Sequence, residues 1–140
     1  MSIFHFFKKK SNKRPGSLLE ILAKTDHLNN LGVQAYMEGN IALAISYYKQ
    51  ALAVFPKNDD ALINLARCHL QMKLYEQAVE FCKIAISIDP NRKEAYHTLG
   101  DAYMELSFVG RGIECYKIAA KLGDESAKNY LERWGLNQYD

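Results

Sequence analysis

The residue types best suited to chemistry in this sequence are cysteine and histidine, because thiolates and imidazoles bind zinc and serve in nucleophilic catalysis. Cys68, His69 and Cys82 lie close together, but their spacing matches no zinc pattern and includes no Cys-x-x-Cys pair. The histidines are scattered, at His5, His27, His69 and His97. Gly-rich phosphate loops and the HExxH and GxSxG motifs are absent. The sequence predicts no catalytic residue, no metal site and no cofactor, and we expect the cysteines to pack in a core.

Composition excludes several classes of protein. The chain has 140 residues, of which 49% are hydrophobic and 24% charged, which suits one compact folded domain. A formal net charge of +2 is far below the basic excess of a nucleic-acid-binding domain. No apolar run reaches the roughly 20 residues of a membrane-spanning helix. An odd number of cysteines without a paired motif indicates a reducing compartment, so we expect a cytoplasmic protein.

The elements that position the side chains follow an internal repeat. Shifting the sequence by 34 residues aligns three units, which begin near Thr25, Asp59 and Lys93. The aligned columns are Leu31, Leu65 and Leu99; Gly32, Ala66 and Gly100; Ala44, Ala78 and Gly112; Tyr48, Cys82 and Tyr116; Ala51, Ala85 and Ala119; and Pro56 and Pro90. In each unit, apolar residues recur at helical spacing on both sides of a short break. Each unit is therefore predicted to form two antiparallel helices.

Unit length, the small and large columns and the terminal prolines together resemble the tetratricopeptide repeat family over about Thr25–Asp124. The resemblance implies an all-α fold, a right-handed α-solenoid of three antiparallel helix pairs with a C-terminal capping helix. The predicted organisation is a tail over 1–16, a short helix over 17–24, repeats over 25–58, 59–92 and 93–124, a capping helix over 125–135 and a tail over 136–140.

The resemblance also implies a binding groove, lined by exposed side chains of the first helix of each unit. The predicted lining is Asn29, Asn30, Val33, Met37, Ile63, Asn64, Arg67, Gln71, His97, Thr98, Asp101 and Glu105. Asn30, Asn64 and Thr98 share one column, and in related arrays such asparagines hold the backbone of a bound peptide. The alternative is that two asparagines on a solvated face bind nothing. The groove predicts a protein partner that presents an extended or helical segment.

The charges of the predicted groove favour a neutral or basic segment. Its acidic residues are Asp26, Asp60, Glu94, Asp101 and Glu105, against one cation, Arg67. The first three also lie in the first turn of a predicted helix, where the helix dipole stabilises a carboxylate. Some members of the family hold acidic chaperone tails in a carboxylate clamp of lysine, arginine and two asparagines. Only Asn64 matches that clamp, so the sequence disfavours this function.

The N-terminal tail is a second candidate binding segment. Phe4, Phe6 and Phe7 precede Lys8, Lys9 and Lys10, with Lys13 and Arg14 following and no acidic residue up to Gly16. Apolar residues beside a basic cluster suit an anionic membrane surface. The alternative is a solubilising tail without a partner. Nucleic acid is disfavoured, because the repeats present no aromatic platform for bases.

Together these features predict a non-catalytic adaptor that binds a partner segment in the groove of a repeat array. Two alternatives stay open within that class: a secretion-type chaperone built from three such repeats, and a peripheral membrane adaptor anchored through the tail. The rival class is an enzyme or a metal-binding protein, which metal analysis of the purified protein would detect.

Overall fold

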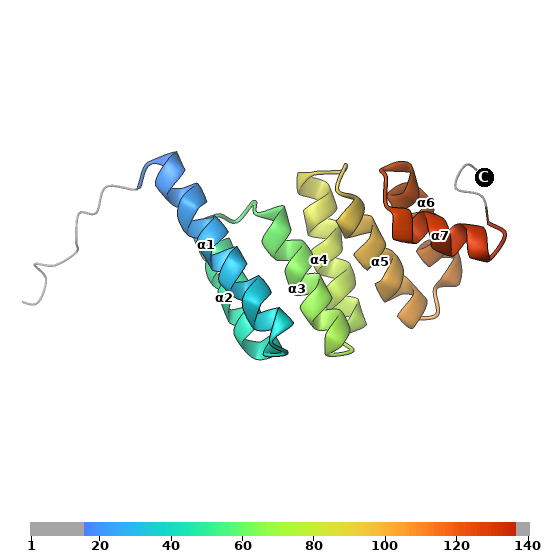
Figure 1. Ribbon diagram of the computed structural model, residues 1–140, viewed down its shortest axis with the longest axis horizontal. Helices are drawn as coiled ribbons and strands as arrows, with labels where there is room; N and C mark the ends of the chain where they lie inside the picture. Colours follow the sequence, from blue (N-terminus) through green and yellow to red (C-terminus); the bar gives the residue numbers. More distant parts are fainter. Residues whose placement is uncertain (1–15, 137–140) are drawn as a thin grey trace, which may run out of the picture.

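A computed structural model describes residues 16–136, and in that part of the chain seven helices and no strands form. The helices are α1 (Leu18–Met37), α2 (Ile41–Val54), α3 (Asp59–Gln71), α4 (Tyr75–Ile88), α5 (Lys93–Glu105), α6 (Val109–Lys121) and α7 (Glu125–Arg133). Helix α1 packs on α2, α3 on α4 and α5 on α6, and the three pairs stack in chain order with α7 against α6 (Figure 1). The predicted fold class, an all-α solenoid, is confirmed.

The ends of the second helices follow from the prolines. Helices α2 and α4 stop at Val54 and Ile88, and the next residues, Phe55 and Asp89, are extended with ψ near 100°. A residue before proline is pushed out of the helical region, because the proline ring collides with its backbone. The third unit has no proline at this place. Its helix α6 ends before Gly123, whose φ of +96° is accessible to glycine at little cost.

The turn within each pair differs between the units. In the first unit, Gly39 takes a positive φ and the Asn40 side chain accepts a hydrogen bond of 3.1 Å from the Leu43 amide, which caps α2. In the second and third units, Lys73 and Ser107 take the positive φ, and no side chain caps α4 or α6. The break is thus kept in all three units although its residues change.

The predicted short helix over 17–24 is not a separate element. Helix α1 runs from Leu18 to Met37 without interruption, because no proline stands between those residues and no glycine stands between the predicted short helix and Thr25. A capping box fixes its start: the Glu20 amide donates to the Ser17 hydroxyl at 3.3 Å, and the Ser17 amide donates to the Glu20 carboxylate at 3.1 Å. The first repeat therefore has a longer first helix than the other two.

The core lies between the helices of each pair and between successive pairs. Alanines of the repeat columns are fully buried, including Ala44, Ala51, Ala78, Ala85 and Ala119. Tyr48 and Tyr116 fill the space beside Gly32 and Gly100, where a Cβ atom would collide with the tyrosine ring. Glycine is required at these two places by the close approach of the neighbouring helix.

The three thiols are buried in this core, and we expect them to be unreactive in the folded protein. Burial raises the pKa of Cys68 and Cys115 to about 11 and that of Cys82 to about 12. The thiolate is the reactive form, so labelling by an aromatic disulfide at pH 8 should be at least about a hundredfold slower in the native than in the unfolded chain. An added exposed thiol, in Ser87→Cys, should react at once. Fast labelling of a native thiol would contradict the burial of these columns.

The same pKa shifts set a direction for stability at high pH. Because the thiol pKa values are raised in the folded state above their ordinary value near 9, the unfolded chain loses these protons first as pH rises. Their contribution to stability is complete below about pH 8 and declines above about pH 9.

Candidate functional site

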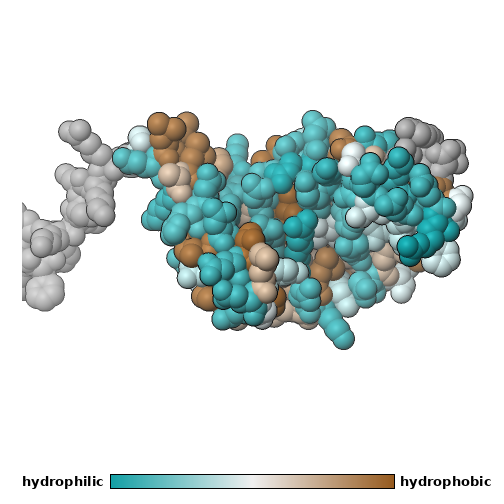
Figure 2. All heavy atoms as spheres, in the orientation of Figure 1, coloured by the Kyte–Doolittle hydropathy of each residue, from teal (hydrophilic) through white to brown (hydrophobic). Residues whose placement is uncertain are grey.

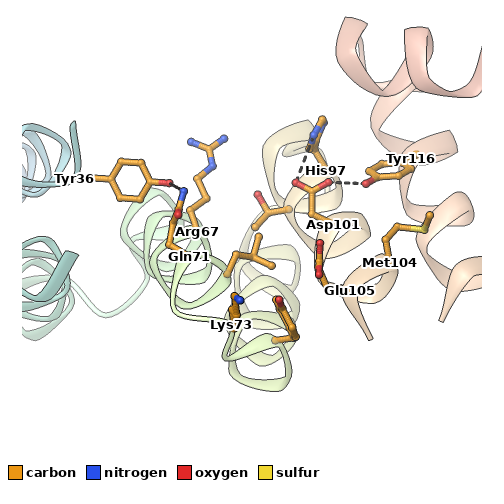
Figure 3. A pocket seen from close by; sticks show the side chains of 12 residues that line it. Tyr36, Arg67, Gln71, Lys73, His97, Asp101, Met104, Glu105 and Tyr116 are labelled. Carbon is orange, nitrogen blue, oxygen red and sulfur yellow. Dashed lines mark hydrogen bonds and ion pairs between the residues drawn. The ribbon is translucent and has the colours of Figure 1, made fainter. Parts of the chain in front are cut away.

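A groove of about 620 Å³ opens along the face formed by α1, α3 and α5 (Figure 3). Tyr36 comes from the last turn of α1, and Arg67 and Gln71 from α3. Helix α5 provides a run of polar side chains on the other side, and Lys73 and Tyr75 close one end from the turn before α4 and its start. The Gln71 amide donates a hydrogen bond of 3.1 Å to the Tyr36 hydroxyl, which joins the first two units across the groove.

Half of the predicted lining residues are brought together in this groove. They are Arg67, Gln71, His97, Thr98, Asp101 and Glu105. Val33 and Asn64 line a small adjoining hollow of about 90 Å³ together with Tyr36 and Arg67. Asn30 is exposed outside both hollows, and Met37 is 81% exposed at the end of α1.

Three of the predicted groove residues, Asn29, Ile63 and Thr98, are buried rather than exposed. Asn29 and Ile63 occupy the same repeat position, which faces into the array in the first two units. The Oδ1 atom of Asn29 has no hydrogen-bond partner among residues 16–136. Thr98 borders the groove but is buried, and its hydroxyl donates to the Glu94 carbonyl at 2.7 Å. The predicted third rung of the amide ladder is therefore satisfied within its own helix.

The predicted excess of acid in the groove is also corrected. Arg92, the residue before α5, contacts the carboxylates of Asp59, Asp60 and Glu94, the last two at 2.7 and 3.3 Å. Burial alone lowers the pKa of Arg92, but the hydrogen bonds and charges of Asp60 and Asp59 outweigh it and raise the pKa. Asp60 and Glu94 are thus paired at the start of their helices. The charged lining of the groove is two cations, Arg67 and Lys73, and two carboxylates, Asp101 and Glu105.

One wall of the groove is a hydrogen-bonded network. The Tyr116 hydroxyl donates to Asp101 at 2.5 Å, and His97 lies 3.6 Å from the same carboxylate (Figure 3). The His97 Nδ1 atom lies 3.0 Å from Asp124. Burial raises the pKa of Tyr116, and its hydrogen bond to Asp101 raises it further, so the phenol keeps its proton. The network holds Asp101 in position and joins α5, α6 and the start of α7.

Sequence reasoning missed one column of groove residues. Tyr36, Leu70 and Met104 stand 34 residues apart, next to the predicted column of Met37, Gln71 and Glu105, and all three line the groove. Their shared repeat position was the available signal. Lys73, Tyr75 and Tyr116 reach the groove from the turn and the second helices, which the first-helix rule did not cover.

Among residues 16–136, no three His, Cys, Asp or Glu side chains gather as metal ligands would. No helix between those residues is both long and apolar enough to cross a membrane. Cys68 and Cys82 are core residues, and the Nδ1 atom of His69 lies 2.8 Å from the Leu65 carbonyl oxygen.

The fold and the groove define the protein as an α-solenoid of helical hairpins. Residues 35–102 match the profile of the tetratricopeptide repeat family. The matched residues are just under half of the chain, and the seven helices between residues 16 and 136 are consistent with three such repeats and a capping helix.

Solved structures of tetratricopeptide (TPR) domains resemble the chain closely. The first TPR of Spaghetti (RPAP3), bound to the HSP90 peptide SRMEEVD, has a TM-score of 0.75 at 22% sequence identity, over 79% of this chain and 92% of that one. The Sgt2 TPR domain from Aspergillus fumigatus has a TM-score of 0.73 at 27% identity, over 78% of this chain and 75% of that one. The Arabidopsis OM64 TPR domain has a TM-score of 0.76 at 23% identity, over 81% and 95%. No curated protein sequence matches the chain.

Proposed function

We propose that this protein is a non-catalytic adaptor that binds an extended segment of a partner protein in the groove between α1, α3 and α5. The observation that carries the proposal is the state of the groove's charges. Arg67, Lys73 and Glu105 line it without an ion pair among residues 16–136, so they are available to a partner. A solved relative of this fold binds a peptide, which supports a peptide ligand here.

The segment we propose places a basic side chain at Asp101 and Glu105. These carboxylates lie on one helix face at the open side of the groove, and Asp101 is held by Tyr116. Asn64, in the adjoining hollow, supplies an amide for the peptide backbone. Arg67 and Lys73 on the other side suit the carbonyl oxygens or an acidic residue of the same segment.

Charge reversal in the groove tests this function. We expect Glu105→Lys to weaken binding of a basic peptide about five- to tenfold at low salt, because it replaces an attraction by a repulsion at the groove. Peptides selected from a synthetic library and labelled with fluorescein would be titrated and followed by anisotropy. Asn64→Ala should weaken every selected peptide by a similar factor or less, since one backbone contact is lost.

Matched controls separate the groove from the rest of the surface. Glu132→Lys makes the same change of charge as Glu105→Lys at an exposed residue of α7. Lys49→Glu makes a change of equal size and opposite sign at an exposed residue of α2. We expect neither to change the affinity by more than about twofold. Equal effects of Glu105→Lys and Glu132→Lys, or selected peptides that are insensitive to both groove substitutions, would show that the groove is not the site.

A further inference from the structure

Exposed apolar side chains lie at two places along α1. At its start, Leu18 and Leu19 are 66% and 78% exposed, and hydrophobic atoms gather there in Figure 2. The predicted membrane contacts before this point lie outside the described residues, and they stay a prediction: Phe4, Phe6, Phe7, Lys8, Lys9 and Lys10. Near the end of α1, Val33 and Met37 are 41% and 81% exposed. The charged side chains of the groove indicate which kind of partner meets this second place.

The side chains that cross the groove change their chemistry from α1 to α5. Two repeat positions show this change, and they lie four residues apart on each helix, so they share one helix face. Their members are Val33, Arg67 and Asp101 at the first position, and Met37, Gln71 and Glu105 at the second. At both positions α1 provides an apolar side chain, α3 a cation or an amide, and α5 a carboxylate. An extended segment that crosses the three helices therefore meets these groups in a fixed order.

The charged groups in this order stay apart and accessible. Figure 3 shows Arg67 between Tyr36 of α1 and Asp101 of α5. Within residues 16–136, Arg67 is exposed and forms no ion pair with Asp101 or Glu105. Glu105 is exposed, and the Asp101 side chain is 41% exposed although Tyr116 donates to it. The two sides of the groove thus do not neutralise each other by direct contact, and each is open to an opposite charge on a partner.

The spacing of the helices sets the spacing of the partner's side chains. Helix α3 contacts both α1 and α5, and helices in contact lie about 8–10 Å apart. In a polyproline II segment, side chains three residues apart point to the same side and lie about 9 Å from each other. A β-strand would instead turn every second side chain away from the groove. Side chains at three-residue intervals of a polyproline II segment therefore match α1, α3 and α5.

We propose, as a refinement that rests on the function proposed above, that the groove selects a polyproline II segment with an apolar, an acidic and a basic residue at three-residue intervals. The apolar residue contacts Val33 and Met37 on α1. The acidic residue pairs with Arg67, and the basic residue pairs with Asp101 and Glu105. The order is selected because exchanging the two charged residues would bring like charges together on both α3 and α5.

Two peptides of equal composition test the order. One carries leucine, glutamate and lysine at three-residue intervals in a background of proline and alanine, and the other has the glutamate and lysine exchanged. Each is made in both backbone directions. Titration of the full chain to millimolar peptide at about 50 mM salt, followed by NMR chemical shifts, gives the dissociation constants. We expect the order leucine, glutamate, lysine to bind at least about tenfold more tightly than the exchanged order.

Substitutions on both sides identify the contacts. Replacing the peptide's glutamate by lysine should weaken binding to the natural protein about tenfold, and Arg67→Glu should restore it. Arg133→Glu makes the same substitution at an exposed residue of α7 and should restore nothing. Val33→Ser and Met37→Ser combined should remove most of the effect of replacing the peptide's leucine by serine, because the apolar contact is then already lost. Circular dichroism confirms that each variant is folded.

The outcomes separate this inference from the binding function itself. Equal affinities of the two orders, no recovery in Arg67→Glu, or no binding of any of these peptides would overturn the inference. The binding function would survive that result if peptides selected from the library still lost affinity with Glu105→Lys. Selected peptides that ignore both Glu105→Lys and Asn64→Ala would remove the function and the inference together.

Discussion

Ala85→Asp is expected to destabilise the protein by about 3–5 kcal/mol, because it places an unpaired carboxylate where no water and no cation can reach it. Ala85 is fully buried between the second and third repeats, in a cluster with Leu62, Ile63 and Ala95. A repeat array is stabilised mainly through its neighbour interfaces. Damage at this place therefore separates the third repeat and α7 from the first two. Urea and thermal unfolding, followed by circular dichroism at 222 nm, measure the loss.

The matched control is Ala53→Asp in the same part of another second helix. Ala53 is exposed near the end of α2, so its replacement introduces the same charge near a helix C-terminus without burying it. We expect a loss of about 0.5 kcal/mol or less. If the two variants unfold alike, the interface between the second and third repeats is not where the 34-residue register puts it.

Gly100→Ala is expected to destabilise the protein by about 2–3 kcal/mol, although alanine normally favours a helix. An added Cβ would lie 2.7 and 2.8 Å from two ring atoms of Tyr116 and 3.3 Å from the Gly112 carbonyl oxygen. The tyrosine is buried and hydrogen-bonded to Asp101, and the carbonyl belongs to the backbone, so neither moves freely. The variant should unfold at lower urea and bind groove peptides less tightly, because Tyr116 holds Asp101 in the wall.

Gly110→Ala separates this collision from a general effect of removing glycine. Gly110 lies in the first turn of α6 with open space where its Cβ would be. We expect Gly110→Ala to be neutral or to stabilise the protein by up to about 1 kcal/mol, through the lower entropy of the unfolded chain. The same substitution then has opposite effects at two helical glycines. Stabilisation by both changes would refute the close contact between α5 and α6.

The fold could be predicted because the repeat columns record packing. Glycine or alanine recurs where two helices touch, and proline where the second helix must stop, as at Pro56 and Pro90. The 34-residue register could not predict the structure at the end of the array. The helix before the first repeat was predicted as separate, but nothing in its sequence breaks it, so it continues into α1. A repeat pattern predicts the contacts between adjacent repeats, and it predicts nothing at the end of the array, where no adjacent repeat exists.

The site was predicted only in part, for a reason of helix geometry. Asn29 and Ile63 lie at the edge of the exposed face of their helices and are buried. A small rotation of the helix decides whether such a side chain faces solvent or the next helix, and residue spacing alone does not determine that rotation. Ion pairs between residues about one repeat apart could not be predicted from spacing either. Arg92 contacts Asp59 and Asp60 from more than 30 residues away, and this removed charge from the predicted groove.

The carboxylate of Asp124 has two tasks at once. One oxygen accepts the Ala127 amide at 2.8 Å and starts α7, and the other meets His97 at 3.0 Å, whose ring faces Asp101 in the groove. The residue that starts the capping helix thus contacts a wall of the groove, although α7 lies outside the three repeats. The three repeats therefore depend on α7 for part of their structure. Transferred into another array without α7, they would keep the fold but lose the arrangement of the groove.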